Sequence, residues 1–261
     1  MKKKVLLIAA LFTAGLSFAQ DGLTSKKGVP ILPEAGDWSI GFDASSLLNY
    51  GGNMLNGNTD NSFAPMGDVN ANTVYGKKFI DANTAYRAML RLGFGSNTNT
   101  TYVKDLSDGA DADATVENDT TMSSFNITIG GGKEFRRGKG RLQGVYGPMA
   151  SVSFGTSKQV HEFGNDLSSN NAAERITEAK NGSTFGLALG GFAGVEYFFA
   201  PKISLGAEIG WNIQLSNTGD GEVTTEKWTT ASESNTVESA GNSSFSFDTR
   251  PNANITLNFH F

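Results

Sequence analysis

The most constraining feature of this sequence is a regular alternation of apolar and polar residues over unusually long segments. From Ile203 to Leu215 every odd-numbered residue is apolar, and the residues between them are Ser, Gly, Glu, Asn or Gln. A period of two places successive side chains on opposite faces of a β-strand. Residues 185–199 and 243–261 repeat the pattern. All three segments are longer than the usual soluble strand of about five or six residues.

Five further segments show the same alternation less cleanly. They are residues 38–44, 73–80, 86–94, 125–135 and 142–154. The weakest is 73–80, because Lys77 and Lys78 interrupt its pattern and leave its facing ambiguous. Together with the three clear segments they predict eight strands, and an even number is typical of bacterial outer-membrane barrels.

The two faces of these strands differ in side-chain size, which indicates what each face contacts. The polar face is rich in Gly, Ser and Asn, whereas the apolar face is bulky and carries aromatic residues toward the segment ends. A narrow lumen requires small residues, while lipid and its interfaces favour large apolar and aromatic ones. The alternative is a soluble sandwich or lipocalin with a dry core. Strand length favours an all-β, eight-stranded antiparallel up-and-down transmembrane β-barrel spanning residues 37–261.

The N-terminus predicts export. Residues 1–19 combine three lysines, a short apolar run and small residues before Gln20, which is the pattern of a signal peptide. A membrane anchor is the alternative, but a spanning helix needs about 20 apolar residues. Residues 20–36 are then expected to form a periplasmic N-terminal segment. We therefore expect the protein in the cell outer membrane.

Composition excludes several classes of function. The chain has no cysteine, which removes disulfide scaffolds, thiolate metal sites and cysteine nucleophiles. A formal net charge of -5 supplies no basic field for nucleic acid, so no nucleic-acid partner is expected. The mean hydropathy of -0.26 argues against a helical membrane protein.

The connections between the predicted strands alternate between short and long. Residues 81–84, 136–141 and 200–202 are short turns, whereas four polar segments are predicted to be long extracellular loops: 48–72, 97–120, 157–182 and 216–242. Short periplasmic turns and long outer loops are typical of outer-membrane barrels.

Charged residues on the inward parity are the main candidates for a functional site. An eight-stranded barrel is narrow enough to be filled by its own side chains, so opposite charges there should pair. We interpret them as a structural plug, and the alternative is a gated path for small solutes. The predicted lumen charge network comprises Asp43, Arg87, Arg91, Glu134, Glu196, Glu208, Asp248 and Arg250.

Catalytic and metal chemistry find little support. The two histidines, His161 and His260, lie in no recognisable nucleophile or metal motif. His161 with Glu162 could bind a metal, but a solvated loop pair is the favoured interpretation. We expect no catalytic residue, no metal site and no cofactor.

Two of the predicted loops carry features that could bind a ligand or partner. The second loop is acidic, with Asp105, Asp108, Asp111, Asp113, Glu117 and Asp119. Calcium is one reading, but the spacing fails the EF-hand order, and mutual repulsion is preferred. Trp228 in the fourth loop is either a binding anchor or packs against the next loop.

Three segments resemble the small OmpA-type outer-membrane β-barrel family. They are SKKGVPILPEAGDWSIGFDASSLLNYGGN from Ser25, YGKKFIDANTAYRAMLRLGFG from Tyr75 and the terminal ITLNFHF. The family's C-terminus ends in alternating aromatics that the barrel-assembly machinery reads. The resemblance thus implies an assembly signal at Leu257, Phe259 and Phe261, with that machinery as a partner during insertion.

These observations predict a non-enzymatic outer-membrane barrel with a structural or interaction role through its surface loops. Its expected partners are outer-membrane lipid and an outer-membrane protein complex. The alternative function is a narrow channel for ions or small solutes. An outer-membrane enzyme is disfavoured because no Ser or His constellation is recognisable.

Overall fold

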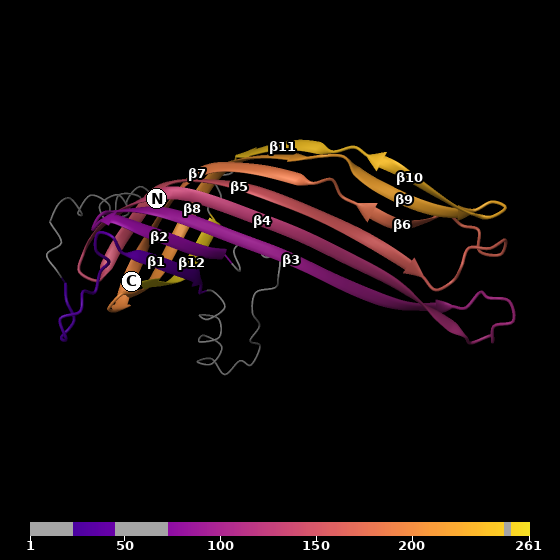
Figure 1. Cartoon of the computed structure of the whole chain (residues 1–261), viewed down its shortest axis with the longest axis horizontal. Helices are drawn as coiled ribbons and strands as arrows, with labels where there is room; N and C mark the ends of the chain where they lie inside the picture. The colour runs from indigo at the N-terminus through magenta and orange to yellow at the C-terminus, as the bar shows by residue number, and fades with distance from the viewer. Residues whose placement is uncertain (1–22, 45–72, 248–251) are drawn as a thin grey trace, which may run out of the picture.

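The computed structural model describes residues 23–44, 73–247 and 252–261. The signal-peptide prediction and the predicted loop 48–72 fall outside these residues. The described residues form twelve β-strands (Figure 1). The strands are β1 (Trp38–Asp43), β2 (Thr73–Asp81), β3 (Thr84–Lys104), β4 (Thr115–Lys139), β5 (Leu142–Phe163), β6 (Arg175–Lys180), β7 (Thr184–Ala200), β8 (Ile203–Thr218), β9 (Gly221–Trp228), β10 (Ser232–Ser239), β11 (Asn242–Phe247) and β12 (Asn252–His260).

No helix within the described residues is long and apolar enough to cross a membrane.

Eight of these strands close into an antiparallel ring, which confirms the predicted up-and-down barrel. Consecutive neighbours pair in the order β1, β2, β3, β4, β5, β7, β8, β12. The ring closes between β1 and β12, where Ser39 lies opposite His260 and Phe42 lies opposite Leu257. Closure pairs the backbone groups of the first and last strands, which is required of a sheet in lipid.

The apolar face of the barrel points outward, as the alternation predicts. In β8, Ile209, Trp211 and Ile213 are exposed, whereas Ser204 on the opposite face is fully buried. Each strand of the ring exposes at least one large apolar side chain, although in β2 this is Ile80 near the end of the strand. On the other strands these side chains include Trp38, Ile40, Phe42, Tyr86, Leu90, Leu92, Phe125, Ile129, Leu142, Tyr146, Phe185, Leu189, Val195, Tyr197 and Phe259. An apolar exterior around a polar interior is the arrangement that lipid stabilises.

The structure resolves the ambiguous facing of β2. Lys77 is buried in the lumen, and Phe79 on the same face is also buried. Lys78 points outward, donates to the carbonyl oxygen of Gly36 at 2.6 Å, and lies 4.4 Å from the Trp38 ring centroid. Two adjacent lysines therefore face opposite sides of one strand, as a period of two requires.

Three of the segments predicted to be loops are strand over half of their length or more, which corrects the predicted connections. β3 and β4 pair without interruption from Thr84↔Phe135 to Lys104↔Thr115, so only residues 105–114 connect them. Residues 157–182 contain the end of β5 and all of β6, and residues 216–242 contain β9 and β10. β4 has 25 residues, whereas a tilted membrane-spanning strand needs about 9–11.

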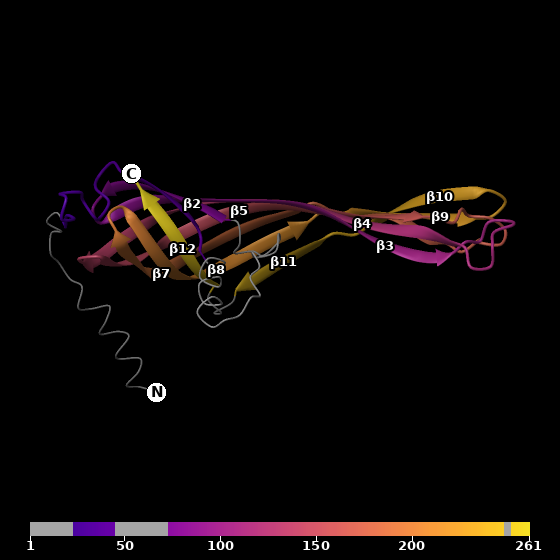
Figure 2. The same ribbon diagram turned by 90° about the horizontal axis from the view of Figure 1, so that it is seen from below.

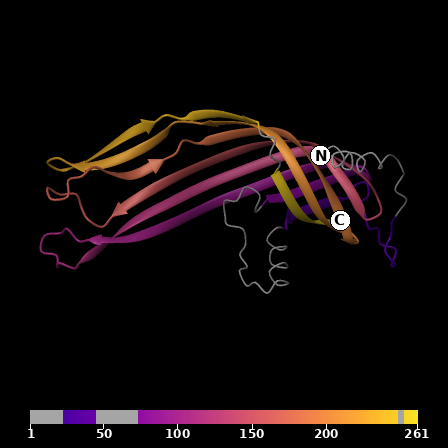
Figure 3. The ribbon, with the colours of Figure 1, turned by 180° about the vertical axis from the view of Figure 1, so that it is seen from behind.

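The extra length forms a single-layer sheet beyond the barrel, which we call the extension. It comprises residues 93–104, 115–126 and 156–163 together with β6, β9 and β10, in the order β10-β9-β6-β5-β4-β3. Figure 1 shows its strands side by side, and Figure 2 shows that they form one thin layer. Figure 3 shows the same sheet from behind, continuous with one wall of the barrel.

The N-terminal segment packs against the opposite end of the barrel. This turn end carries the short connections at residues 82–83, 140–141 and 201–202. Residues 23–36, which we call the N-terminal cap, place Ile31 and Leu32 in a buried cluster with Phe198. The backbone N–H of Lys202 donates to the Ile31 carbonyl at 3.0 Å. The segment predicted to precede the barrel is therefore packed against it.

Candidate functional site

A layer of charged side chains lies inside the barrel, near the turn end. Its six members are contributed by five strands of the ring: Lys77 from β2, Arg87 from β3, Glu134 and Arg136 from β4, Glu196 from β7 and Glu208 from β8. We call them the charge layer. All six are on the inward parity of their strands, because the outward positions between them carry the lipid-facing residues.

Arg136 joins the two most buried carboxylates. Its Nη1 atom lies 2.7 Å from Glu134 Oε1 and 2.6 Å from Glu196 Oε2. Lys77 Nζ adds a second bridge between the same carboxylates, at 3.1 Å and 3.4 Å. Glu134 is 0% exposed, and Arg136 and Glu196 are each 1% exposed. Two cations therefore hold two acidic groups together in a buried part of the lumen.

Arg87 extends this layer toward the far end of the barrel. It donates two hydrogen bonds to Glu208, Nη1 to Oε1 at 3.0 Å and Nη2 to Oε2 at 2.9 Å. It also approaches Glu134 at 3.4 Å, and its guanidinium lies 4.0 Å from the Phe192 ring centroid. The bidentate geometry fixes the planar guanidinium across the lumen between β3 and β8.

The second oxygen of Glu196 is satisfied by neutral groups from β8 and β12. Ser204 donates to Glu196 Oε1 at 2.6 Å, and Asn258 Nδ2 donates to it at 3.1 Å. His260 Nε2 lies 3.0 Å from Ser204 Oγ and 3.4 Å from Glu196 Oε1. The His260 ring also lies between Phe79 and Phe198, at centroid distances of 5.6 Å and 5.1 Å. The charge layer is thus sealed by aromatic rings on its turn-end side.

The charge layer contains three cations and three carboxylates, so it is electrically balanced when His260 is neutral. Each removed partner would leave an uncompensated charge in a buried site, which is strongly unfavourable. The charged side chains are linked across the lumen by ion pairs. The arrangement is suited to closing the barrel, because nothing in it requires a bound ion for charge balance.

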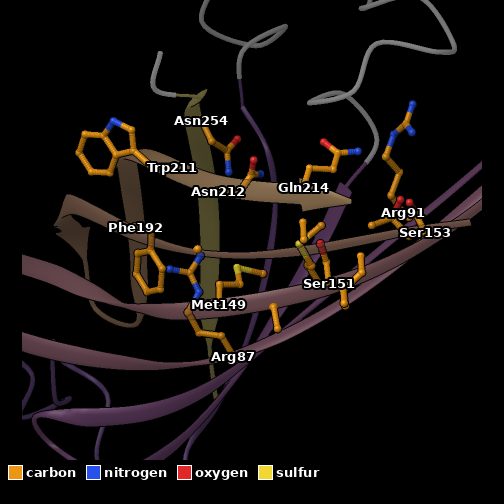
Figure 4. Close-up of a pocket in the computed structure, with 18 of the residues that line it drawn as sticks. Arg87, Arg91, Met149, Ser151, Ser153, Phe192, Trp211, Asn212, Gln214 and Asn254 are labelled. Atoms are coloured by element: carbon orange, nitrogen blue, oxygen red, sulfur yellow. The ribbon is translucent and has the colours of Figure 1, made fainter. Parts of the chain in front are cut away.

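A cavity lies on the far side of the charge layer, between the barrel walls (Figure 4). It has a volume of about 570 Å³. Figure 4 shows Asn212, Gln214 and Asn254 along one side of it and Ser151 and Ser153 across from them. Arg87 and Phe192 form its floor. The cavity is lined by both polar and apolar side chains, and it reaches the charge layer at Arg87 and Glu208.

The structure brings together four of the eight predicted lumen charges: Arg87, Glu134, Glu196 and Glu208. Arg91 lines the cavity instead and donates to Asn126 Oδ1 at 2.9 Å. Asp43 ends β1 and is half-buried. Asp248 and Arg250 lie outside the described residues.

Sequence reasoning missed Lys77, Arg136 and His260 as members of this site. Arg136 falls in the segment predicted to be a turn, although it shares the parity of Glu134, and that parity was the available signal. Lys77 could not be assigned to the lumen because the sequence does not show which face of its strand points inward. His260 carries no motif, but it lies on the polar parity of a clearly alternating segment.

The cap is fastened to the barrel rim by Asp37 and Lys202. Lys202 Nζ donates to Asp37 Oδ2, and the Glu34 backbone N–H donates to the same oxygen at 2.7 Å. Burial opposes the charged form of Asp37, but the Lys202 and Glu34 hydrogen bonds outweigh it, so the pKa of Asp37 lies below its ordinary value.

The remaining candidates lie at the two ends of the molecule. Trp228 ends β9 and pairs with Ser232 across the hairpin tip, rather than lying in an irregular loop. Leu257, Phe259 and Phe261 follow the outward parity of β12, and Phe261 exchanges backbone hydrogen bonds of 2.7 Å and 2.9 Å with Trp38.

The residues weighed and disfavoured as metal ligands in the sequence have other neighbours in the structure. His161 Nδ1 lies 3.1 Å from Thr120 Oγ1, and its ring stacks on Phe163. The acidic segment is the tip of the β3–β4 hairpin, where Asp105 accepts hydrogen bonds from the backbone and hydroxyl of Ser107. Within the part of the chain that the structure describes, no three His, Asp or Glu side chains are grouped to hold a metal ion.

Comparison with known families decides the identity of the barrel. Residues 61–212 match the OmpA-OmpF-like porin family. The chain belongs to this family. No curated protein sequence matches the chain. Family membership and the closed antiparallel ring together establish an outer-membrane β-barrel protein of porin-like type, and they support a non-enzymatic protein.

Proposed function

We propose that this protein is a closed, non-enzymatic barrel of the outer membrane that carries the extension outside the cell as an interaction surface. The observation that carries the proposal is the extension itself. Strands of 21, 25 and 22 residues continue far beyond the length that a membrane requires. This orientation follows the usual arrangement of short periplasmic turns and longer external segments.

The charge layer and the N-terminal cap support a closed lumen. Ions entering from the cavity would meet the buried groups Glu134, Arg136 and Glu196, which are joined by ion pairs of 2.7 Å and 2.6 Å through Arg136 Nη1. Beyond them the path meets Phe198 and the cap residue Ile31, which are also buried. Conduction would require several of these contacts to break at once.

Recordings from planar lipid bilayers with purified, refolded protein test the closed lumen. We expect no reproducible unitary conductance. Pull-down of the tagged protein from native membranes tests the interaction role, and we expect a stoichiometric partner that is lost when the extension is removed. Reproducible conductance by a protein recovered alone would overturn the proposal.

A narrow channel is the second candidate function, and the 570 Å³ cavity favours it. The cavity gives solutes access to the lumen as far as Arg87, so movement of the charge layer alone would open a path up to the cap. A channel predicts conductance that rises when the cap is detached. The matched comparison is wild type against Asp37→Asn, which leaves the charge layer intact.

The C-terminal strand supports the proposed assembly route. Phe259 and Phe261 are exposed on the lipid-facing parity of β12, where the barrel-assembly machinery could read them before the ring closes. Replacement of Phe261 by Ser is expected to reduce insertion in cells without preventing refolding from urea into vesicles.

A further inference from the structure

Within the described residues the extension has two open edges, and neither contains Pro or a bulge; the charges of β10 are the two acidic residues Glu233 and Glu238. Within the described residues β10 pairs only with β9, and β3 beyond Arg91 pairs only with β4. Exposed edges are normally blunted by Lys, Pro or a bulge because their unpaired N–H and C=O groups recruit other strands. β10 has neither Lys nor Pro, and residues 93–104 contain only Lys104, at the distal end. These edges are therefore suited to pairing with another strand.

We infer that the extension joins copies of this protein side by side, with β10 of one copy pairing with β3 of the next. This inference rests on the proposed interaction role and names its partner as a second copy of the chain. The directions of the strands support pairing between β10 and β3. Each of the five neighbouring pairs from β3 to β10 is antiparallel, so the two edges of this six-stranded sheet run in opposite directions.

Membrane insertion then restricts how the edges can meet. All copies enter the membrane in one direction, so a two-fold axis along the membrane normal would bring identical edges together as parallel strands. Antiparallel pairing of β10 with β10, or of β3 with β3, would require one copy to be inverted. Simple translation brings β10 beside β3 in the antiparallel sense that the sheet already uses. The contact is head-to-tail and therefore produces rows.

The register of this contact can be read across the sheet. Thr98 pairs with Thr121, and the same row continues through Val160, Glu178, Thr224 and Thr236. Thr98 and Thr236 thus lie on one row and on one face. Along such a row, hydrogen-bonded pairs alternate with non-hydrogen-bonded pairs. Six strands make five pairs, so the first and last pairs of the row are of the same kind. The two outer residues therefore both direct their backbone N–H and C=O groups toward the neighbouring copy, or both direct them away from it. Thr236 therefore fits opposite Thr98 of the next copy.

The neighbouring positions in this register are compatible. Antiparallel counting from Thr236↔Thr98 places Asn235 opposite Asn99 and Ser234 opposite Thr100. Thr pairs already link strands within the sheet, at 2.8 Å for Thr98–Thr121 and 2.9 Å for Thr224–Thr236. The acidic residues of β10 meet no acidic residue, because residues 93–104 contain none. Like charges opposite each other would have destabilised the contact.

The barrels leave room for such rows. Six strands at a spacing of about 4.8 Å give a repeat of about 29 Å. An eight-stranded ring with strands tilted by about 40° is about 16 Å across its backbone, or about 26 Å with side chains on both sides. The sheet is therefore slightly wider than the barrel beneath it, so translated copies do not collide in the membrane.

Disulfide cross-linking tests the contact, because the natural chain has no cysteine. Full-length Thr98→Cys and Thr236→Cys proteins carrying tags of different size are reconstituted together in lipid vesicles. We expect a mixed dimer and no cross-linked dimer from either variant alone. The double variant should form a ladder of dimers, trimers and larger species. Met122→Cys, which is exposed on the central strand β4, is the matched control and should not cross-link to Thr236→Cys.

Charge changes at a third position verify the register. Thr101 falls opposite Glu233 of the next copy, so Thr101→Glu in the Thr98→Cys protein should reduce the yield of mixed dimer and Thr101→Lys should preserve it. Three results would overturn the inference. The first is an equal yield of mixed dimer for Thr101→Glu and Thr101→Lys, and the second is a dimer formed by one cysteine variant alone. The third is the absence of any dimer although a maleimide reagent labels both cysteines. If the protein shows no conductance in planar bilayers but does not cross-link, only the self-association is refuted. If the protein conducts, the proposed function is refuted.

Discussion

Arg136 is the residue on which the charge layer depends most directly. It is the only described side chain within 2.7 Å of both Glu134 and Glu196. Arg136→Met should destabilise the barrel by about 3–5 kcal/mol, because two buried carboxylates lose one of the two cations that they share and keep only Lys77 between them. Urea unfolding in lipid vesicles, followed by tryptophan fluorescence, measures this change. Arg137→Met removes the adjacent exposed arginine and should change stability by less than about 0.5 kcal/mol; similar losses for both variants would contradict the role of the layer.

Asp37 makes attachment of the N-terminal cap dependent on pH. Its pKa in the folded protein lies below its ordinary value of 3.8, because hydrogen bonds from Lys202 and Glu34 outweigh burial. A lowered folded-state pKa means that the stabilisation is present above the unfolded pKa and is lost as pH falls through the folded value. Proteolysis within residues 23–36 by an acid-active protease should therefore increase below about pH 3.8. In Asp37→Asn the cap should be cleaved readily at every pH; a wild-type-like profile for this variant would rule out the clasp.

The parity of a strand predicts which face a residue occupies, but not its depth in the barrel. Parity alone placed Arg87, Glu134, Glu196 and Glu208 in the lumen, because a strand fixes which side of the sheet each residue occupies. Parity gives no distance along the barrel, so it did not separate Arg91, which lines the cavity, from the charge layer. Arg136 was missed because the strand was taken to end where its apolar alternation ended.

Glycines on the inward parity allow strands of the barrel to approach closely. A Cβ atom at Gly147 of β5 would lie 1.8 Å from the carbonyl oxygen of Lys133 in β4. Because that atom belongs to the backbone, Gly147→Ala should displace β5 from β4 and lower the yield of folded barrel. Gly76→Ala in β2 is the control, since its nearest atom would be at 4.0 Å. The fraction that migrates as folded barrel on unheated gels measures both; equal fractions would show that the strands accommodate the methyl group.

Among the elements, the barrel strands were predictable and the extension was not. β8 buries one face against the lumen and exposes the other to lipid, so its sequence alternates between polar and apolar residues. Residues 96–101 are polar on both faces because both faces meet water, and their sequence therefore resembles a loop. Thr is nevertheless well suited to a strand, and cross-strand pairs such as Thr98–Thr121 each contribute about 0.2–1 kcal/mol. The strands of the extension were predicted to be loops because strands were identified by alternation of apolar and polar residues, and not by the β-propensity of residues such as Thr.

At the scale of the whole molecule, the barrel and the extension are separable. The ring is complete without the tip of the β3–β4 hairpin, since Gly95 and Ser124 already lie opposite each other. Replacing residues 96–123 by Asn-Gly should join β3 and β4 through a two-residue turn and leave the ring intact. A shorter connection also lowers the entropy cost of closing the hairpin.

The spliced protein should therefore fold into the membrane while losing association. We expect urea stability within about 1 kcal/mol of wild type, because the charge layer and cap are untouched. The spliced chain carries no cysteine, so its association with the Thr236→Cys protein is measured by co-purification of the two differently tagged chains, which should disappear because the β3 edge is gone. A matched chain with the Thr98→Cys substitution and full-length strands serves as the positive control. Failure of the spliced chain to fold would mean that the extension is needed to build the barrel and is more than a platform attached to it.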